Sequence, residues 1–323
     1  MIKNILIVGA GNFGFAFSKM LSEHADSTIK ITIFDKNCDT IKKIKDKKYL
    51  KRVMIAEKIE LGYDLIVFAI PSEYIKSFLV QNKDKILSDC VFLNLSKGFD
   101  SKSSKLISEI VDEMNFKNDF VHIGGGSIAN DMISNKPIGL TIASNNIKLA
   151  YEIRNLFEQS NIMCQVSTDV LGVQLCGICK NIASIGAGIV DEYYKCDSSK
   201  ALYVSLINQE ILKFVQIWQI RQNTFDFASF AWSTDLLGSC YGQSRNRLFG
   251  INIAKKIKNS CLNTKINNNL IISKILKEQP TIEGYYALKY AFALIKNNKL
   301  NLPLIEKMYR ILYLNSKELD ILS

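Results

Sequence analysis

Short apolar runs alternate with segments of helical periodicity along the first half of the chain. Residues 5–8 form a mostly β-branched run, and residues 13–22 follow it with apolar side chains at helical spacing. Further short apolar runs predict buried strands over residues 29–34, 64–70, 90–95, 121–123 and 140–143. Because the strands alternate with helical segments, the pattern predicts an α/β fold with a Rossmann-type, doubly wound parallel sheet.

The pattern changes after about residue 168. From Asp169 onward nearly all apolar positions recur at helical spacing, with clear stripes over residues 202–217 and 285–295. We therefore expect a Rossmann domain over residues 1–168 and an all-helical substrate and catalytic domain over residues 169–323. Ligands of open α/β sheets bind beyond the carboxyl ends of the strands, so the active site is expected in the cleft between the domains.

A glycine-rich turn joins the first predicted strand to the first predicted helix. Gly9, Gly11 and Gly14 have G-x-G-x-x-G spacing, and Asp35 ends the next strand. Such glycines permit a tight turn, close approach of a pyrophosphate and close packing of helix on strand, while the helix N-terminus supplies amide donors. Asp35 can accept hydrogen bonds from ribose hydroxyls, which favours NAD, whereas Lys36 could meet the 2′-phosphate of NADP. A glycine turn in an unrelated α/β fold is the alternative interpretation.

One lysine interrupts the most apolar segment of the chain, residues 171–190. Twenty mostly apolar residues could span a membrane, but the glycines and polar residues inside this segment favour a closely packed core helix. A lysine is ordinarily a surface residue, yet an unpaired ammonium in a core is costly. Lys180 is therefore expected to point into a cleft and meet a carboxylate, where it could act as a general acid or base.

Small and polar residues gather over residues 235–247. Hydroxyl groups, glycines and the pair Arg245 and Arg247, on either side of Asn246, suit a phosphate or pyrophosphate. By composition alone, the start of a solvated helix is an equally good interpretation.

The formal net charge of +10 over 323 residues raises the question of a nucleic-acid or membrane partner. The densest basic run, residues 42–52, has helical spacing and no interleaved aromatic residues. A solvated helix face is therefore the better interpretation, and no nucleic-acid partner is expected. A positive field also attracts an anionic cofactor or a phosphorylated substrate.

The eight cysteines have no disulfide-framework spacing, which indicates reduced thiols in a cytoplasmic protein. Cys176 and Cys179 have the spacing of a redox dithiol motif, but they lie inside the long apolar segment and are interpreted as core residues. With only His24 and His122 in the chain, no metal site is expected. The apolar start of the chain resembles a signal peptide, but its glycines fall at fingerprint positions, so we interpret it as a buried strand.

Taken together, these motifs resemble the NAD(P)-dependent glycerol-3-phosphate dehydrogenase family along nearly the whole chain. The matching stretches are short, but their order and spacing make the combination specific. They are residues 9–14, 70–72, 96–98, 125–129, 169–173, 180–181, 197–201, 235–247 and 283–284. The resemblance implies reversible reduction of dihydroxyacetone phosphate to sn-glycerol 3-phosphate, by a cytoplasmic homodimer that supplies glycerophospholipid synthesis.

The resemblance also implies roles for individual residues. Lys180 would be the general acid/base, oriented and charge-balanced by Asp235. The residues expected to contact the substrate are Lys97, Gly125, Ser127, Lys180, Asp235, Ser244, Arg245 and Asn246. With the glycine loop included, those expected to hold NAD or NADP are Gly9, Gly11, Asn12, Phe13, Gly14, Asp35, Lys36, Lys97, Ala129, Arg245 and Glu283.

Several residues depart from the family pattern. Gly126 replaces a usual proline, which is expected to loosen a pocket wall, and Gln174 and Asp131 stand where glutamates are usual. Ser239 stands for a threonine of part of the family, and residues 191–193 for a smaller Asp-Gly-Leu turn. None of these changes removes the expected acid/base or phosphate ligands, but they bear on substrate affinity and identity.

Two other functions compete with this interpretation. Another two-domain dehydrogenase, acting on a hydroxy acid or a ketopantoate-like substrate, would also need a glycine fingerprint and a cleft lysine, but not the cluster at residues 244–246. A catalytically silent dinucleotide sensor would need neither Lys180 nor Asp235 nor Arg245.

Overall fold

A computed structural model describes residues 2–45, 52–126, 129–260, 267–278 and 282–323 of the chain. Its first part is one eight-stranded sheet in the order β3-β2-β1-β4-β5-β6-β7-β8. The strands are β1 (Asn4–Val8), β2 (Lys30–Phe34), β3 (Val53–Ala56), β4 (Leu65–Phe68), β5 (Val91–Asn94), β6 (Phe120–Gly125), β7 (Ile138–Ser144) and β8 (Ile162–Ser167).

Helices cover both faces of the sheet, so the central strands are buried on both sides. Ile5 and Ile7 of β1 face the core that includes α1 and α6, whereas Leu6 and Val8 face the core that includes α3 and α4. This two-sided burial explains why the strands read as continuous apolar runs. The helices of this part are α1 (Asn12–His24), α2 (Cys38–Lys45), α3 (Ser72–Asn82), α4 (Ile107–Glu113), α5 (Ala129–Ile133) and α6 (Ile147–Asn155), with the short turn η1 (Lys83–Lys85).

The predicted α/β class is confirmed, and the entirely parallel sheet is wrong at one pair of strands. β6 and β7 run antiparallel, with Gly125 opposite Leu140, whereas the other paired strands are parallel. Among its described residues, the connection between these strands holds one helix, the five-residue α5, and the chain returns in the opposite direction. Two strands escaped prediction: β3 has half-exposed positions, and β8 is a half-buried edge strand.

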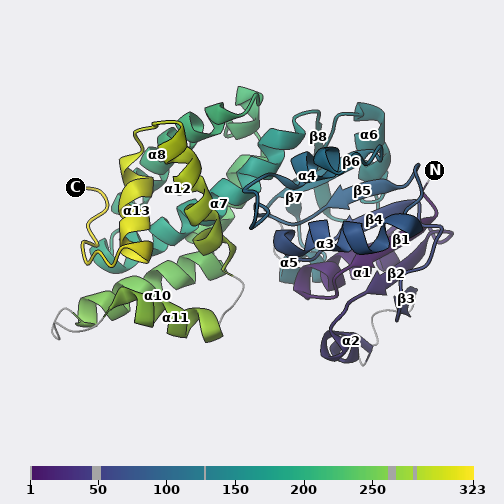
Figure 1. The fold of residues 1–323 in the computed structure, drawn as a ribbon, viewed down its shortest axis with the longest axis horizontal. Helices are drawn as coiled ribbons and strands as arrows, with labels where there is room; N and C mark the ends of the chain where they lie inside the picture. Colours follow the sequence, from purple (N-terminus) through teal and green to yellow (C-terminus); the bar gives the residue numbers. More distant parts are fainter. Residues whose placement is uncertain (1, 46–51, 127–128, 261–266, 279–281) are drawn as a thin grey trace.

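The second part of the chain is helical and is built around α7 (Val170–Tyr194), which lies between the sheet and the other helices in Figure 1. Around it lie α8 (Asp197–Phe214), α9 (Asp235–Tyr241), α10 (Arg245–Ser260), α11 (Asn268–Glu278), α12 (Glu283–Asn297) and α13 (Pro303–Tyr313). Shorter turns are η2 (Val215–Ile217), η3 (Gln222–Phe225) and the π-helical η4 (Phe230–Thr234). The assignment of residues 1–168 and 169–323 to two domains stays a prediction.

The long apolar helix α7 belongs to the core. It is long and apolar enough to cross a membrane by composition, but 94% of its most apolar window is buried inside the protein. Cys176 and Cys179 are buried free thiols within it, as the core interpretation predicts. Cys261 and residues 46–51 of the basic run lie outside the described residues.

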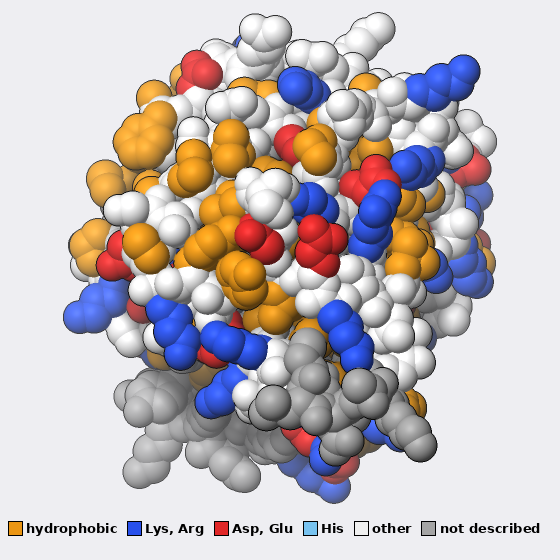
Figure 2. Space-filling view, turned by 90° about the vertical axis from the view of Figure 1, so that its left-hand side faces the viewer, with side chains coloured by type: hydrophobic (Ala, Val, Ile, Leu, Met, Phe, Trp, Pro, Cys, Tyr) orange, Lys and Arg blue, Asp and Glu red, His pale blue; other side chains and the backbone are white. Residues whose placement is uncertain are grey.

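Lysines and arginines on the helical end of the molecule do not form one continuous patch. Figure 2 shows them among acidic and apolar side chains on the face that looks away from the sheet. This face belongs to the helical part, whereas the basic run over residues 42–52 begins in α2 of the sheet part (Figure 1).

Candidate active site

Two lysines from different parts of the fold meet on one carboxylate. Lys180 lies in the middle of α7, Lys97 follows β5, and Asp235 is the first residue of α9. The Nζ of Lys180 is 2.9 Å from Oδ1 of Asp235, and the Nζ of Lys97 is 2.6 Å from Oδ2. All three side chains are at least 88% buried. The expectation that Lys180 would meet a carboxylate in the interior is met.

The charges of this cluster do not cancel. Burial lowers the pKa of Lys97 below its ordinary value, Asp235 opposes that shift, and the nearby Lys180 adds to it. Two ammonium groups share this carboxylate in a region with little water, and the charge of Glu283 also acts on Lys97, so the excess of positive charge around Asp235 is only partly offset. Such a site is suited to a phosphorylated substrate whose carbonyl oxygen gains negative charge during reduction.

The neighbouring backbone fixes where Lys97 points. Its Nζ also donates to the carbonyl oxygen of Gly125 at 2.9 Å. Gly125 has φ +122°, and a Cβ there would stand 2.5 Å from the oxygen of Gly139, so a side chain cannot be accommodated. A Cβ on Gly177 of α7 would stand 3.0 Å from Cγ of Lys97, so this glycine makes room for the lysine stem. Sequence reasoning missed Gly177, because its partner lies 80 positions earlier in the chain.

A second polar group links α7 to α10 and α12. Asn181, next to Lys180, donates to Oε2 of Glu283 at 3.0 Å and accepts from Nδ2 of Asn246 at 2.8 Å. Oδ1 of Asn246 in turn accepts from the backbone N–H of Gly284 at 3.0 Å. The structure therefore brings together two residues predicted for the site, Asn246 and Glu283. Asn181, which joins them, belongs to the matching stretch 180–181 but was assigned no role in the site from sequence alone.

Ser239 lies beside Lys180, and Ser244 is tied to Ser239. The Nζ of Lys180 donates to Oγ of Ser239 at 3.0 Å, and Oγ of Ser244 donates to the carbonyl oxygen of Ser239 at 2.7 Å. Arg245, the first residue of α10, is exposed. Arg247 is held by an ion pair with Asp191, with Nε 2.6 Å from Oδ2. Of the two arginines that suggested a phosphate site, Arg247 is therefore ion-paired with Asp191, and Arg245 is exposed to solvent.

The glycine loop has the geometry that a dinucleotide requires. Gly9 has φ +105°, and a Cβ there would stand 2.6 Å from the oxygen of Ala69. A Cβ on Gly14 would stand 2.0 Å from the oxygen of Gly9, so helix and strand approach too closely for a side chain. A Cβ on Gly11, at the N-cap of α1, would meet no atom within 4 Å. The loop thus leaves open space at the position where the backbone must approach a pyrophosphate.

The residues after β2 are tied to this loop. Oδ2 of Asp35 accepts from the backbone N–H of Ala10 at 2.7 Å, and Oδ1 accepts from that of Asn37 at 2.8 Å. Each carboxylate oxygen retains a lone pair with which it could accept a ribose hydroxyl. The Nζ of Lys36 donates to Oε1 of Gln81 on α3 at 2.8 Å.

The other predicted cofactor residues border the loop. Asn12 and Phe13 form the first turn of α1, and Ala129 is the first residue of α5, which packs against α1. Ser127 lies outside the described residues.

Three of the departures from the family pattern can be placed in the structure. The backbone N–H of Gly126 donates to Oγ1 of Thr234 at 2.9 Å, a bond that a proline could not make. Gly126 therefore ties this wall to η4, and the expected loosening of the wall stays a prediction. Gln174 donates to Oγ of Ser108 at 2.7 Å and so links α7 to α4. Asp131 lies in the first turn of α5, where a carboxylate suits the helix dipole.

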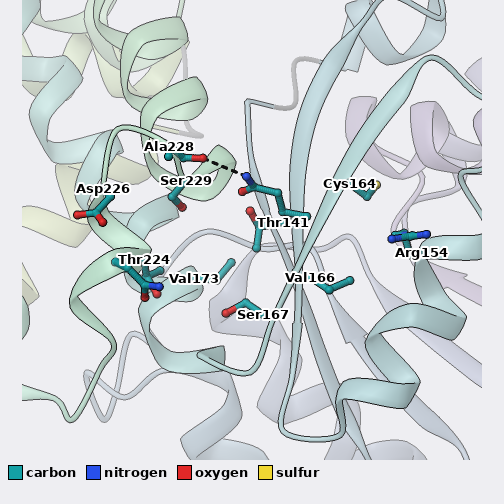
Figure 3. Close-up of a pocket in the computed structure, with 12 residues that line it drawn as sticks. Thr141, Arg154, Cys164, Val166, Ser167, Val173, Thr224, Asp226, Ala228 and Ser229 are labelled. Atoms are coloured by element: carbon teal, nitrogen blue, oxygen red, sulfur yellow. Dashed lines mark hydrogen bonds between the residues drawn. The ribbon is translucent and has the colours of Figure 1, made fainter.

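An open cavity of about 530 Å³ lies elsewhere, beside the edge strand β8. Figure 3 shows Thr141, Val173 and Ser167 on one side of it and Thr224 and Ser229 on the other. None of the lysines or carboxylates of the cluster at Asp235 lines it. The described residues also hold no group of three or more His, Cys, Asp or Glu side chains that could bind a metal.

Comparison with known proteins points to one family over both parts of the chain. The model of the NAD-dependent glycerol-3-phosphate dehydrogenase N-terminus matches residues 4–150, and that of the C-terminus matches residues 169–323. Glycerol-3-phosphate dehydrogenase [NAD(P)+] of Francisella tularensis subsp. tularensis is 29% identical, over 99% of this chain and 96% of its own length. The corresponding Clostridium tetani protein is 27% identical, over 97% and 88%.

Solved structures share the fold. A glycerol-3-phosphate dehydrogenase from Coxiella burnetii has a TM-score of 0.85 at 22% identity, covering 98% of this chain and 96% of its own. A probable 2-dehydropantoate 2-reductase from Bacillus subtilis has a TM-score of only 0.57 at 12% identity, covering 97% and 100%. The ketopantoate-type alternative is therefore the more distant of the two in structure.

Proposed function

The chain belongs to the NAD-dependent glycerol-3-phosphate dehydrogenase family, and on this basis we propose that it interconverts dihydroxyacetone phosphate and sn-glycerol 3-phosphate with a nicotinamide cofactor. The observation that carries the proposal is the buried Lys180–Asp235–Lys97 cluster next to a glycine loop of dinucleotide-binding geometry. A hydroxy-acid or ketopantoate-like substrate carries a carboxylate but no phosphate, so it would not require the serine, arginine and asparagine of residues 244–246.

Lys180 is the proposed acid and base. Reduction of a ketone consumes one hydride and one proton, and the bound nicotinamide supplies the hydride. The Nζ of Lys180 gives its proton to the carbonyl oxygen as that oxygen gains charge, and in the reverse direction it takes the proton from the alcohol. Its contacts with Asp235 and with Oγ of Ser239 fix the direction in which the ammonium points.

Asp235 and Lys97 position the reacting groups. Asp235 offers one carboxylate oxygen to each lysine, so it orients Lys180 and offsets part of the combined charge. Lys97, held by Asp235 and by the carbonyl of Gly125, is the second cation for the substrate. Ser244, Arg245 and Asn246 are proposed to hold the phosphate, and Gly125 and Ser127 to close the pocket.

The cofactor is proposed to lie over the glycine loop, with its pyrophosphate at the N-terminus of α1. Asn12 and Phe13 of that turn, Ala129 of α5, and Lys97, Arg245 and Glu283 from the cleft would line it. The carboxylate of Asp35 supports a preference for NAD, and the engagement of Lys36 by Gln81 weakens the case for a 2′-phosphate partner. From the family resemblance we further propose a cytoplasmic homodimer whose product supplies glycerophospholipid synthesis.

A direct assay tests the proposal. We expect purified protein to oxidise NADH when dihydroxyacetone phosphate is added, with lower kcat/KM when NADPH replaces NADH. Ketopantoate and simple 2-keto acids, run under identical conditions, serve as comparison substrates. No turnover of dihydroxyacetone phosphate with either cofactor would overturn the main proposal, and faster turnover of ketopantoate would favour the alternative.

A further inference from the structure

Asp191, near the end of α7, bridges two buried cations that the proposed chemistry does not use. Its Oδ1 is 2.9 Å from Nζ of Lys200 on α8, and its Oδ2 is 2.6 Å from Nε of Arg247 on α10. The three side chains are 7% to 15% exposed. Lys200 also lies over the ring of Tyr241, with Nζ 4.7 Å from the centroid. One carboxylate thus joins α7, α8 and α10 in a region with little water.

Arg247 connects this group to the segment that carries the proposed phosphate ligands. Its Nη1 donates to the carbonyl oxygen of Gly242 at 3.1 Å, just before Ser244. Its backbone N–H donates to Oγ of Ser244 at 3.2 Å, and that hydroxyl donates to the carbonyl of Ser239. Both ends of the turn between α9 and α10 are therefore tied to one arginine, whose orientation is set by Asp191.

The packing of α10 on α7 leaves this turn little freedom. A Cβ on Gly188 of α7 would stand 2.1 Å from the carbonyl oxygen of Arg247, so the two helix backbones touch at this point. The ion pair with Asp191 lies one turn further along α7. Together the two contacts fix the register of the first turn of α10, where Ser244 and Arg245 begin the helix.

We propose that Asp191 is a positioning residue for substrate phosphate, acting through Arg247 to hold the turn over residues 242–246 in the shape that binds the anion. This inference rests on the proposed function of that turn. Among the described residues, the carboxylate of Asp191 pairs with Lys200 and Arg247, whereas Lys180 pairs with Asp235. Loss of Asp191 should therefore weaken recognition of the phosphate more than it slows reduction of the carbonyl.

The substitutions Asp191→Asn and Arg247→Lys test the inference against the control Asp197→Asn. Asp197 is the other carboxylate near Lys200, at 3.6 Å, but it is 99% exposed. Arg247→Lys keeps the positive charge beside Asp191 and removes the fork that also reaches Gly242, so it remains informative if Asp191→Asn does not fold. Thermal unfolding and the Kd for NADH establish that each variant is folded.

The readout compares substrates with and without a phosphate. For Asp191→Asn and Arg247→Lys we expect kcat/KM for dihydroxyacetone phosphate to fall about tenfold, mainly through KM, because misplacement of a binding group by a fraction of an ångström has effects of this order. With dihydroxyacetone, which lacks the phosphate, kcat/KM should change less than about twofold. Asp197→Asn should match the wild type with both substrates.

A binding measurement separates this inference from the proposed function. Calorimetric titration with inorganic phosphate requires no turnover, and we expect the two variants to bind it more weakly than the wild type and Asp197→Asn. Wild-type protein that binds phosphate but does not reduce dihydroxyacetone phosphate would overturn the proposed function alone. Equal losses with both substrates, unchanged phosphate affinity in folded Arg247→Lys, or no phosphate binding by the wild type would overturn the role of Asp191.

Discussion

A carboxylate shared between two lysines gives each lysine a different environment. Lys97 is held at three points, by Asp235, by the carbonyl of Gly125 and by the wall at Gly177. Lys180 is held by Asp235 and by a hydroxyl of Ser239, which can rotate. The difference suits a division of labour in which Lys97 holds a fixed position and Lys180 exchanges a proton.

Substitutions of Lys180 separate proton transfer from charge. Lys180→Ala removes the proton donor, and we expect kcat to fall at least about 100-fold while the Kd for NADH stays within about twofold, because general acid catalysis contributes this much. Lys180→Arg keeps a cation beside Asp235 but cannot release its proton near neutral pH, so it should be nearly as inactive. The measurements are steady-state turnover of dihydroxyacetone phosphate and a fluorescence titration with NADH.

Full activity of the arginine variant would show that Lys180 contributes only charge. In that case Lys97, the other ammonium on Asp235, would be the next candidate for the acid and base.

At the scale of elements, α7 organises the site because one of its faces is built from small residues. Gly177 makes room for Lys97, and Gly188 allows α10 to approach. Gly284, at the start of α12, packs in the same way: a Cβ there would stand 2.3 Å from the backbone oxygen of Asn181. The helix can therefore bring Lys180 and Asn181 into contact with groups from three other segments.

Gly177→Ala tests whether this face serves the site or only the packing. The added Cβ would stand 3.0 Å from Cγ and 3.2 Å from Cδ of Lys97. The lysine stem would therefore have to shift while its Nζ stays bonded to Asp235 and to the carbonyl oxygen of Gly125. We expect kcat/KM for dihydroxyacetone phosphate to fall about tenfold. Alanine forms helices better than glycine by about 1 kcal/mol, and this gain opposes the cost of the clash with Lys97. The free energy of unfolding should therefore change little.

Gly238→Ala in α9 is the matched control for helix propensity, because a Cβ there would meet no atom within 4 Å. It shows by thermal unfolding how much stability the replacement gives without a clash. An active Gly177→Ala protein of wild-type kcat/KM would contradict the idea that this glycine positions Lys97.

Local patterns predicted most of the elements, and they failed where neighbours distant in sequence decide the structure. The glycine turn, β1 and α7 follow from periodicity and from a lone lysine in an apolar segment. The edge strand β8 does not, because its half-buried positions show no clear alternation of apolar and polar residues. The antiparallel pairing of β6 with β7 does not either, because strand direction depends on the path of the connecting chain. Within the site, Asp235 and Ser244 came from the family resemblance, whereas the contacts of Asn181 and Asp191 needed the assembled helices.

At the scale of the whole molecule, the site exists only where the sheet and the helices meet. The sheet contributes the glycine loop, Lys97 and Gly125, and the helical part contributes Lys180 and Asp235. The net charge of +10 favours the approach of an anionic substrate and cofactor to the molecule as a whole. Polar groups buried near the junction then affect the stability of the fold as well as the chemistry.

His122 on β6 is such a group. Asn94 on β5 accepts from the N–H and the hydroxyl of Ser96 through Oδ1, so its Nδ2 faces Nδ1 of His122 at 3.1 Å. That arrangement places the imidazole proton on Nε2, which has no hydrogen-bond partner among the described residues. Burial, and secondarily the charge of Lys97, lower the pKa of His122 from 6.5 to about 3. The ring therefore stays neutral inside the fold.

This lowered pKa predicts a loss of stability in acid. Between pH 6.5 and about 3 the unfolded chain binds a proton at His122 and the folded protein does not, so the free energy of unfolding falls as the pH falls through this window. The contribution is about 1.4 kcal/mol per pH unit at most. Urea titrations between pH 7 and 4.5 give the slope of the free energy of unfolding against pH. For His122→Val this slope should be smaller than for the wild type, by up to about 1.4 kcal/mol per pH unit. The control Asn94→Ala removes the hydrogen bond to Nδ1 of His122 but keeps the imidazole, so it should retain the wild-type slope. Equal slopes for all three proteins would mean that His122 is protonated in the folded protein. The junction would then tolerate a third positive charge beside Lys97 and Lys180.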